Sequence, residues 1–233
     1  MSLPKLYPIL DTALLERLNV PLLEAAIGMI EAGAHILQLR HKGHFSRDLF
    51  ETAAHLAVLC EQARVGFVIN DRVDMAKLLN AHVHVGQDDL LPAFVRQLSG
   101  PDIIIGLSTH NREQLEAANK VPVDYHALGP IFATGSKADP DPVVGLESLR
   151  EWRPLSERPV VAIGGITLEI AAEVLSAGAD SVAVISGLIP ESPNRKRIRE
   201  GTERGFSQQH PTWMPLGNNF KMLLDVAPDL GNL

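Results

Sequence analysis

Eight short apolar runs, rich in β-branched residues, recur along the chain, and longer segments with helical spacing separate them. Each run is expected to form a buried strand: Leu6–Leu10, His35–Leu39, Phe67–Ile69, His82–Val85, Ile103–Ile105, Tyr125–Leu128, Pro159–Ile163 and Ser181–Ile185. Apolar residues at helical spacing appear at Leu22, Ala25 and Met29, and again between Leu168 and Leu175. This alternation is typical of parallel strands covered by helices, so the sequence predicts an α/β fold.

Eight strand–helix units are the number that closes a (β/α)8 TIM barrel, and 233 residues is near the lower end of its size range. The alternative, an open doubly wound sheet, usually shows Gly-x-Gly-x-x-Gly after its first strand. Here Asp11 and Thr12 follow that strand, with no glycine. We therefore predict one barrel domain over residues 1–190. Residues 191–233 are predicted to form an atypical tail, with a last helix in its first part and loose order beyond it.

Charge and composition narrow the classes of partner. The chain has 21 basic and 28 acidic residues, a net charge of −7, so binding to nucleic acid or to an anionic membrane surface is not expected. The basic run 195–199 is flanked by glutamates and is read as a solvated helix face. One cysteine, Cys60, excludes a disulfide scaffold and fits a reducing compartment. With no signal peptide and no long apolar stretch, the predicted location is cytoplasmic.

Functional groups of a parallel barrel collect where its strands end at their carboxyl sides. On the second strand Gln38 and Arg40 share one face, and Lys42 joins them if the chain stays extended. An anion bound at the mouth of the barrel would explain all three polar residues together. The alternative is that Arg40 extends from the strand end into water.

Two aspartates follow the next two strands. Asn70 and Asp71 come after the third strand and Asp89 after the fourth, so the two carboxylates can converge on Mg²⁺. The alternative is that each aspartate caps the helix that follows it. His82 and His84 have zinc-like spacing but lack a third ligand, so both are expected to be packed and hydrogen-bonded.

A second polar group follows the later strands. Residues 129–144 form a connection long enough to be a lid, with hydroxyls at Thr134 and Ser136 and a cation at Lys137. A solvated turn is the alternative for this segment. Gly165, Ile185 and Ser186 follow strands seven and eight, where such barrels commonly bind phosphate through the backbone. The anion site after the second to fourth strands and this second site together indicate a protein that binds two phosphorylated groups, a pyrophosphate at the first site and a monophosphate at the second.

The ordered set of motifs resembles the thiamine-phosphate synthase family over about residues 5 to 189. The segments that carry the resemblance are Leu37–Lys42, Ile69–Asp74, Val83–Asp89, Ile105–His110, Leu128–Phe132, Ala162–Ile166 and Ala183–Ser186. The resemblance implies an enzyme that joins 4-amino-2-methyl-5-hydroxymethylpyrimidine pyrophosphate to 4-methyl-5-hydroxyethylthiazole phosphate, or its carboxylated form. Pyrophosphate would leave first and generate a pyrimidine carbocation, which the thiazole nitrogen would then attack.

The resemblance also implies a role for each candidate residue. The pyrimidine substrate and its pyrophosphate would be held by Gln38, Arg40, Lys42, Asn70, Ser108 and Lys137. The thiazole phosphate would be held by Thr134, Ser136, Gly165, Ile185 and Ser186. Asp71 and Asp89 would bind Mg²⁺, and Arg40, Lys42, Ser108 and Lys137 would assist the chemistry. The implied partners are these small molecules, and nothing in the sequence excludes a homo-oligomer.

Two alternatives stay open. A related group of thiazole tautomerases carries a catalytic histidine where this chain has Pro130. A barrel that binds phosphate ligands without catalysis is the other, because the lid departs from the family pattern at Ala133, Ser136 and Ala138. The presence of Asp71, Asp89 and Lys137 argues against both.

Overall fold

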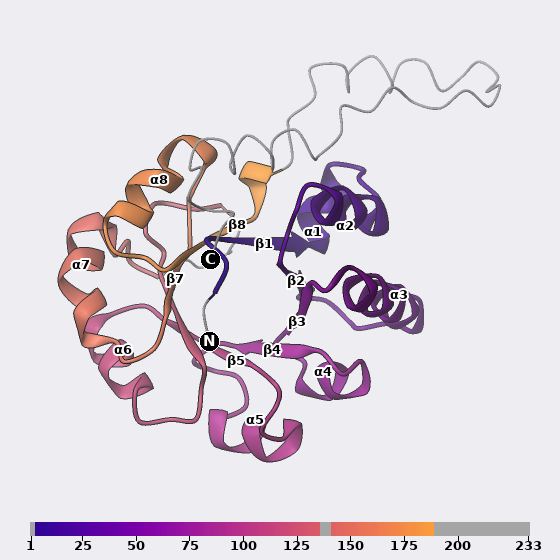
Figure 1. The fold of residues 1–233 in the computed structure, drawn as a ribbon, viewed down its shortest axis with the longest axis horizontal. Coiled ribbons are helices and arrows are strands. Elements are labelled where there is room, and N and C mark those ends of the chain that lie inside the picture. Colours follow the sequence, from indigo (N-terminus) through magenta and orange to yellow (C-terminus); the bar gives the residue numbers. More distant parts are fainter. Residues whose placement is uncertain (1–2, 136–140, 189–233) are drawn as a thin grey trace.

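The computed structural model describes residues 3–135 and 141–188, which form a closed barrel of eight parallel strands (Figure 1). The strands follow one another around the barrel in sequence order: β1 (Leu6–Asp11), β2 (Ile36–Arg40), β3 (Gly66–Asn70), β4 (His82–Val85), β5 (Ile105–Thr109), β6 (Tyr125–Leu128), β7 (Val160–Ala162) and β8 (Ser181–Val184). The last strand pairs with the first, Leu6 opposite Val182 and Pro8 opposite Val184. The predicted TIM barrel is confirmed.

Helices surround the ring of strands, as Figure 1 shows. They are α1 (Thr12–Arg17), α2 (Leu22–Glu31), α3 (Arg47–Ala63), α4 (Val73–Leu78), α5 (Pro92–Ser99), α6 (Arg112–Ala118), α7 (Gly145–Trp152) and α8 (Leu168–Ser176). Two 3₁₀ turns follow α7 and β8: η1 (Arg153–Leu155) and η2 (Ser186–Leu188). None of the helices in the described ranges is long and apolar enough to cross a membrane.

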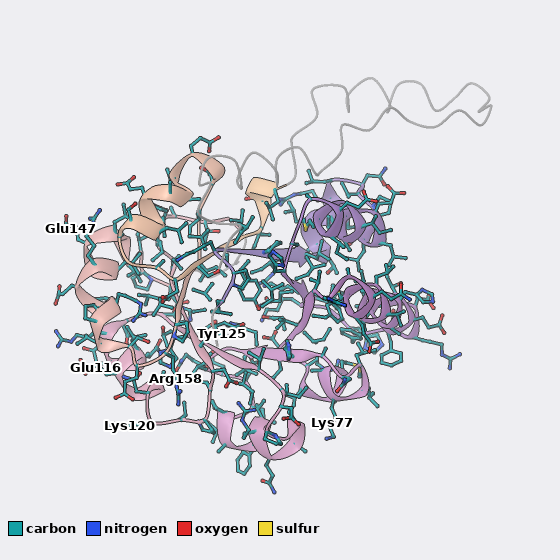
Figure 2. All side chains as sticks on the ribbon, in the orientation of Figure 1. Lys77, Glu116, Lys120, Tyr125, Glu147 and Arg158 are labelled. Carbon is teal, nitrogen blue, oxygen red and sulfur yellow. The ribbon has the colours of Figure 1, made fainter. Side chains whose placement is uncertain are left out.

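Side chains alternate between the two faces of each strand and so build two cores. Those pointing outward, such as Leu37 and Val83, pack beneath the helices. Those pointing inward fill the barrel: Tyr7, Ile9, Ile36, Val68, Tyr125, Ala127, Val161 and Ala183. Figure 2 places Tyr125 inside the ring, with Lys77 and Glu147 on its periphery. Polar groups that enter the inner core must therefore find partners within it.

Most predicted strands match the observed ones to within two residues, but β5 was placed too early. Ile103 and Ile104 only lead into the strand, which runs through the polar residues Ser108 and Thr109. Thr109 tolerates full burial because its Oγ1 donates to the Ala127 carbonyl oxygen over 3.1 Å. The boundary at residue 190 and the tail 191–233 lie outside the described residues and stay predictions.

At the amino-terminal end of the barrel, two aspartates each join a helix to neighbouring strands. Asp124 Oδ2 accepts from the Ile105 amide and from Arg96 Nη2, both at 2.7 Å. Asp180 Oδ2 repeats the arrangement near β7, where it accepts from the Val160 amide and from Arg153 Nε. This face of a TIM barrel serves stability rather than chemistry, and both ion pairs fit that role.

One histidine lies in the outer core. His126 on β6 is fully buried, and its Nδ1 lies 2.8 Å from Ser156 Oγ. Burial, aided by the positive charges of Arg158 and Arg153, lowers the pKa of His126 to about 4. Because the unfolded chain protonates this ring near pH 6.5, the folded state excludes a proton that the unfolded state binds.

The His126→Gln variant should therefore flatten the pH dependence of stability. In the wild type, the contribution of His126 is complete above pH 6.5 and is lost as pH falls toward 4. As the pH falls from 6.5 to 4, the free energy of unfolding should therefore decrease less steeply for the variant than for the wild type. The two slopes should differ by about 1 kcal/mol per pH unit. Urea unfolding at pH 7, 6, 5 and 4.5 measures both slopes. The exposed His55, changed to Gln, is the control, and parallel slopes for wild type and His126→Gln would contradict the assignment.

Candidate active site

An ion pair at the carboxyl ends of β1 and β2 sets the position of Arg40. Its Nη1 donates to Asp11 Oδ2, and both side chains are largely buried. The other carboxylate oxygen of Asp11 accepts from the Leu14 amide over 2.9 Å and caps α1. Arg40 is thus anchored by a carboxylate rather than extended into water, which corrects that alternative. Asp11 was not among the site residues predicted from the sequence.

Beside it lies a cluster of one lysine and two aspartates. Lys42 Nζ donates to Asp71 Oδ2 over 2.6 Å, and the Asp71 and Asp89 side chains share a hydrogen bond. Burial raises the pKa of Asp71, Lys42 opposes the rise, and Asp89 adds to it, through its negative charge and by accepting a hydrogen bond from protonated Asp71. Asp89 Oδ2 also accepts from the Gly86 amide over 2.7 Å. The predicted convergence of Asp71 and Asp89 is present in the structure.

The idea that these aspartates cap helices is wrong. The residue that precedes α4 is Arg72 and the one that precedes α5 is Leu91, and neither helix start has a side-chain cap. Asp71 instead adopts a positive φ of 63°, uncommon for a residue other than glycine. Its amide donates to the His84 carbonyl oxygen over 2.8 Å, which holds the carboxylate at the rim.

Asn70, at the end of β3, has an unsatisfied polar atom. Its side chain is buried, and its Nδ2 has no hydrogen-bond partner among the described residues. Buried amide groups normally have partners, and an unpaired one costs about 1–3 kcal/mol. An orphaned donor next to Asp71 is the kind of feature that a ligand satisfies.

A chain of hydrogen bonds crosses the interior of the barrel below these charges. Gln38 Nε2 donates to the Tyr7 hydroxyl over 3.0 Å, and the hydroxyls of Tyr7 and Tyr125 lie 2.8 Å apart. His84 connects the chain to the mouth, with Nδ1 3.0 Å from the Tyr125 hydroxyl and Nε2 2.9 Å from Ser108 Oγ. Five strands thus contribute to one polar array, which ends at two residues predicted from the sequence, Gln38 and Ser108.

The array is uncharged near neutral pH. Burial raises the pKa of Tyr7 to about 12 and raises that of Tyr125 well above its usual value. Burial also lowers the pKa of His84 to about 4. The expectation that His84 is packed and hydrogen-bonded is confirmed. His82 lies deeper, where its Nδ1 accepts from the Ile104 amide over 3.2 Å, and no group of three metal-binding side chains occurs in the described ranges.

Gly106 makes room for this array. A Cβ at this position would lie 2.1 Å from Cζ of Tyr125 and 2.5 Å from Nδ1 of His84, closer than atoms can approach. Tyr125 pairs with Gly106 in the β5–β6 register, so its ring occupies the space of the missing side chain. Neither tyrosine was among the predicted site residues, although the alternation of side chains along β1 and β6 places both inside the barrel.

The second group of predicted residues follows β6 to β8. Gly165 has a positive φ of 65°, and a Cβ there would lie 2.5 Å from the Ala133 carbonyl oxygen. The Phe132 amide donates to the Gly164 carbonyl oxygen over 3.0 Å, so the glycine pair lets the loops after β6 and β7 touch. Ile185 and Ser186 directly follow β8.

Of the three lid residues predicted from the sequence, one is in the described part of the chain and two are not. Thr134 lies on the loop after β6, within the described residues. Ser136 and Lys137 lie outside them, so the placement of these two residues stays a prediction.

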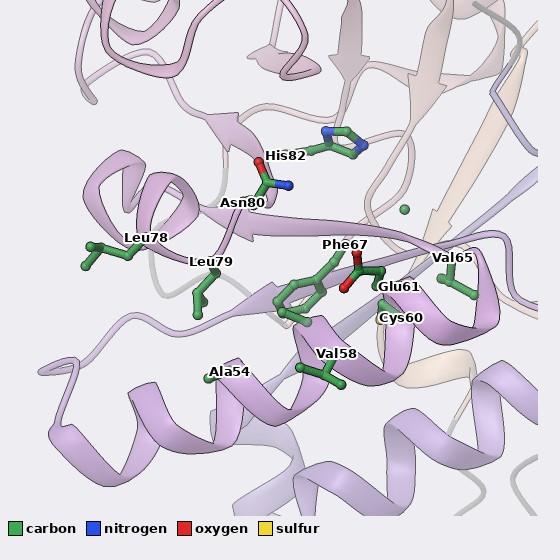
Figure 3. A pocket seen from close by; sticks show the side chains of 12 residues that line it. Ala54, Val58, Cys60, Glu61, Val65, Phe67, Leu78, Leu79, Asn80 and His82 are labelled. Atoms are coloured by element: carbon green, nitrogen blue, oxygen red, sulfur yellow. The ribbon is translucent and has the colours of Figure 1, made fainter.

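A surface cavity of about 370 Å³ lies elsewhere, between α3 and α4 (Figure 3). Val58 and Cys60 line it from α3, and Leu79 and His82 line it from the other side. It opens near the amino-terminal ends of β3 and β4, away from the mouth. Since the polar groups described above converge at the opposite end, the mouth is the candidate active site.

Comparisons with known proteins agree on one family. The model of the thiamine monophosphate synthase family matches residues 6–188. The thiamine-phosphate synthase of Koribacter versatilis (strain Ellin345) is 46% identical over 198 residues, 84% of this chain and 93% of the relative. That of Persephonella marina (strain DSM 14350 / EX-H1) is 39% identical over 201 residues, 85% and 92% of the two chains. The solved thiamine phosphate pyrophosphorylase from Pyrococcus furiosus superposes with a TM-score of 0.77 at 29% identity, covering 97% of this chain and 96% of that one.

The Gly106→Ala substitution should disrupt the interior array. The added methyl group has to displace Tyr125 or His84, so we expect a loss of about 1–3 kcal/mol in the free energy of unfolding, measured by urea denaturation. Gly66→Ala is a matched control on β3, because the nearest atoms to its Cβ lie at an ordinary 3.6 Å. Equal losses for the two variants would show that Gly106 does not make this space.

Proposed function

The chain belongs to the thiamine monophosphate synthase family and has thiamine-phosphate synthase activity in thiamine biosynthesis, and from this premise we propose how its residues divide the reaction. The rim of β2, β3 and β4 holds the pyrimidine pyrophosphate. The loops after β6, β7 and β8 hold the thiazole phosphate. These two small molecules are its proposed partners. The cytoplasm is its proposed location, which suits the free buried thiol of Cys60.

Arg40, Lys42 and Asn70 bind the pyrophosphate group in this proposal. The ion pair with Asp11 holds Arg40 in place before substrate arrives, so less side-chain freedom is lost on binding. A guanidinium has five N–H donors, which leaves it able to contact both the carboxylate and a phosphate oxygen. The orphaned Nδ2 of Asn70 would gain the partner that it lacks.

Asp71 and Asp89 would hold Mg²⁺. Their carboxylates supply the oxygen ligands that Mg²⁺ prefers, and the pair that now shares a hydrogen bond would gain from a shared cation. Bound there, the ion supplies positive charge to the departing pyrophosphate. Lys42, already in contact with Asp71 Oδ2, would orient that carboxylate and add a second positive charge beside the leaving group.

The neutral array beneath the charges suits a carbocation. Gln38 and Ser108 would contact the pyrimidine, each held by its neighbours, Tyr7 and His84. Because the low pKa of His84 keeps its ring uncharged, no positive group of the array opposes a cation forming above it. No proton has to be removed before pyrophosphate leaves, so the site needs no general base.

The thiazole phosphate would lie on the opposite side of the mouth. Thr134, Gly165, Ile185 and Ser186 are proposed to hold it, together with Ser136 and Lys137. In support, the glycine pair allows the Phe132–Ala133 segment to lie directly against the loop after β7. Lys137 would also reach the pyrophosphate and assist its departure, as expected from the resemblance.

The contact between Lys42, Asp71 and Asp89 is the observation that carries this proposal. A thiazole tautomerase has no pyrophosphate to release and so no use for such a cluster, and this chain has Pro130 at the position of the tautomerase histidine. A non-catalytic phosphate-binding barrel would need cations but not paired carboxylates, which repel phosphate when no metal ion lies between them.

Pyrophosphate release should require both substrates and Mg²⁺. Purified protein treated with EDTA should lose activity, measured as pyrophosphate formed, and excess Mg²⁺ should restore it. Turnover of the carboxylated thiazole phosphate without coupling would favour the tautomerase instead. Binding of either substrate without any turnover would favour the binding barrel, and full activity in EDTA would contradict the metal site.

The Asp71→Asn variant should weaken the metal site. We expect the Mg²⁺ concentration for half-maximal pyrophosphate release to rise at least about tenfold, because one charged ligand is lost. Asp74→Asn is the matched control: Asp74 follows the same strand, but its carboxylate pairs with Arg72 on the exposed surface. An unchanged Mg²⁺ requirement in Asp71→Asn would remove this residue from the metal site.

A further inference from the structure

The ring of His110, the residue that directly follows β5, contacts the loop after β6. Its Nδ1 lies 2.6 Å from the Gly129 carbonyl oxygen, and the side chain is largely buried. A carbonyl oxygen can only accept a hydrogen bond, so Nδ1 carries a proton and donates it in this contact. His110 is not among the residues proposed to hold a substrate, and its ring therefore has a structural partner without an assigned task.

The backbone of His110 is itself held in place. Its amide donates to Gln114 Oε1 over 2.7 Å, and the Gln114 amide donates to Asn111 Oδ1 over 2.9 Å at the start of α6. This pairing is typical of a capped helix start. On the other side, the Gly129 amide donates to the Thr109 carbonyl oxygen over 3.1 Å. Because both ends of the contact are anchored, the ring holds Gly129 with little loss of freedom.

Gly129 in turn lies directly against the end of β7. A Cβ at Gly129 would lie 2.1 Å from the Ile163 carbonyl oxygen. The Ile131 amide donates to that same oxygen over 2.8 Å, and the Phe132 amide donates to the next carbonyl oxygen, that of Gly164. A displacement of Gly129 would therefore be passed to the two loops proposed to hold the thiazole phosphate.

The ring of His110 also lies beside the returning arm of the 129–144 connection. Asp141 Oδ2 is 3.6 Å from the same Nδ1. The Val144 amide donates to the Pro130 carbonyl oxygen over 2.8 Å, which joins the returning arm to the outgoing one. His110 thus stands at the base of this connection, where its two described arms meet.

We propose that His110 is a positioning residue for the thiazole phosphate, an inference that rests on the proposed placement of that substrate. By donating to the Gly129 carbonyl oxygen, it fixes the loop after β6 against Gly164 and Gly165. The phosphate-binding groups of the two loops then keep their spacing, which a binding site must hold to within about 0.5 Å. The pyrimidine side is independent of this contact, because Ser108 has its own partner in His84.

Steady-state pyrophosphate release by the full chain tests this inference, with the KM of each substrate measured while the other is saturating. His110→Leu removes the donor, so the KM for the thiazole phosphate should rise at least about tenfold. The KM for the pyrimidine pyrophosphate should stay within about twofold of the wild-type value. In His110→Asn the amide nitrogen takes the place of Nδ1, so the thiazole phosphate KM should stay within about threefold of the wild-type value.

Two further variants separate positioning from folding. Gln114→Ala frees the His110 backbone but keeps its ring, and it should raise the thiazole phosphate KM by about threefold. Asn119→Ala is the matched control, because Asn119 Nδ2 donates to the Leu155 carbonyl oxygen over 2.8 Å at the amino-terminal end of the barrel. It should lower thermal stability and leave both KM values unchanged. Circular dichroism establishes that each variant folds.

An equal rise of both KM values in His110→Leu would overturn the inference, as would no recovery in His110→Asn or the same rise in Asn119→Ala. Ser186→Ala tests the placement of the thiazole phosphate by itself and should also raise its KM. A rise in Ser186→Ala without one in His110→Leu and Gln114→Ala would overturn the role of His110 alone. No rise in any of the three would overturn the proposed placement as well.

Discussion

All eight strands end on one rim because β8 hydrogen-bonds to β1 and closes the sheet. In an open sheet the residues after the first and last strands would lie far apart. Pairing of β1 with β2 places Asp11 opposite Arg40, and closure brings β8, and with it the turn that follows β8, to the other side of β1. The charged groups come from segments that are distant in the sequence, and only this geometry gives them a common position.

The polar array inside this barrel is tolerated because its members are hydrogen-bonded to one another. Tyr7, Tyr125 and His84 lie in the inner core, where an unpaired hydroxyl or ring nitrogen would cost more than its hydrogen bond contributes. Gly106 supplies the space and Gln38 and Ser108 complete the series. The same contacts that satisfy the core therefore orient the two side chains proposed to face the pyrimidine.

Much of this architecture could be predicted from the sequence, because strand–helix alternation and the number of units are local patterns. The convergence of Asp71 and Asp89 was predictable once neighbouring strands were assigned. Tyr7 and Tyr125 were not found, since their contact depends on the space that Gly106 leaves on a third strand. The start of β5 was misplaced because burial of Thr109 depends on a hydrogen bond to another strand, which periodicity does not report.

The overlap between core and site has a consequence for attempts to engineer the substrate range. Tyr125 touches its neighbours so closely that even one added methyl group on Gly106 would collide with it. Substitutions that enlarge or reshape the barrel interior below the mouth would therefore lower the stability of the fold as well as change substrate binding. Exposed residues of the loops around the rim, such as His44 after β2, do not pack in the barrel core and are where a redesigned enzyme can vary.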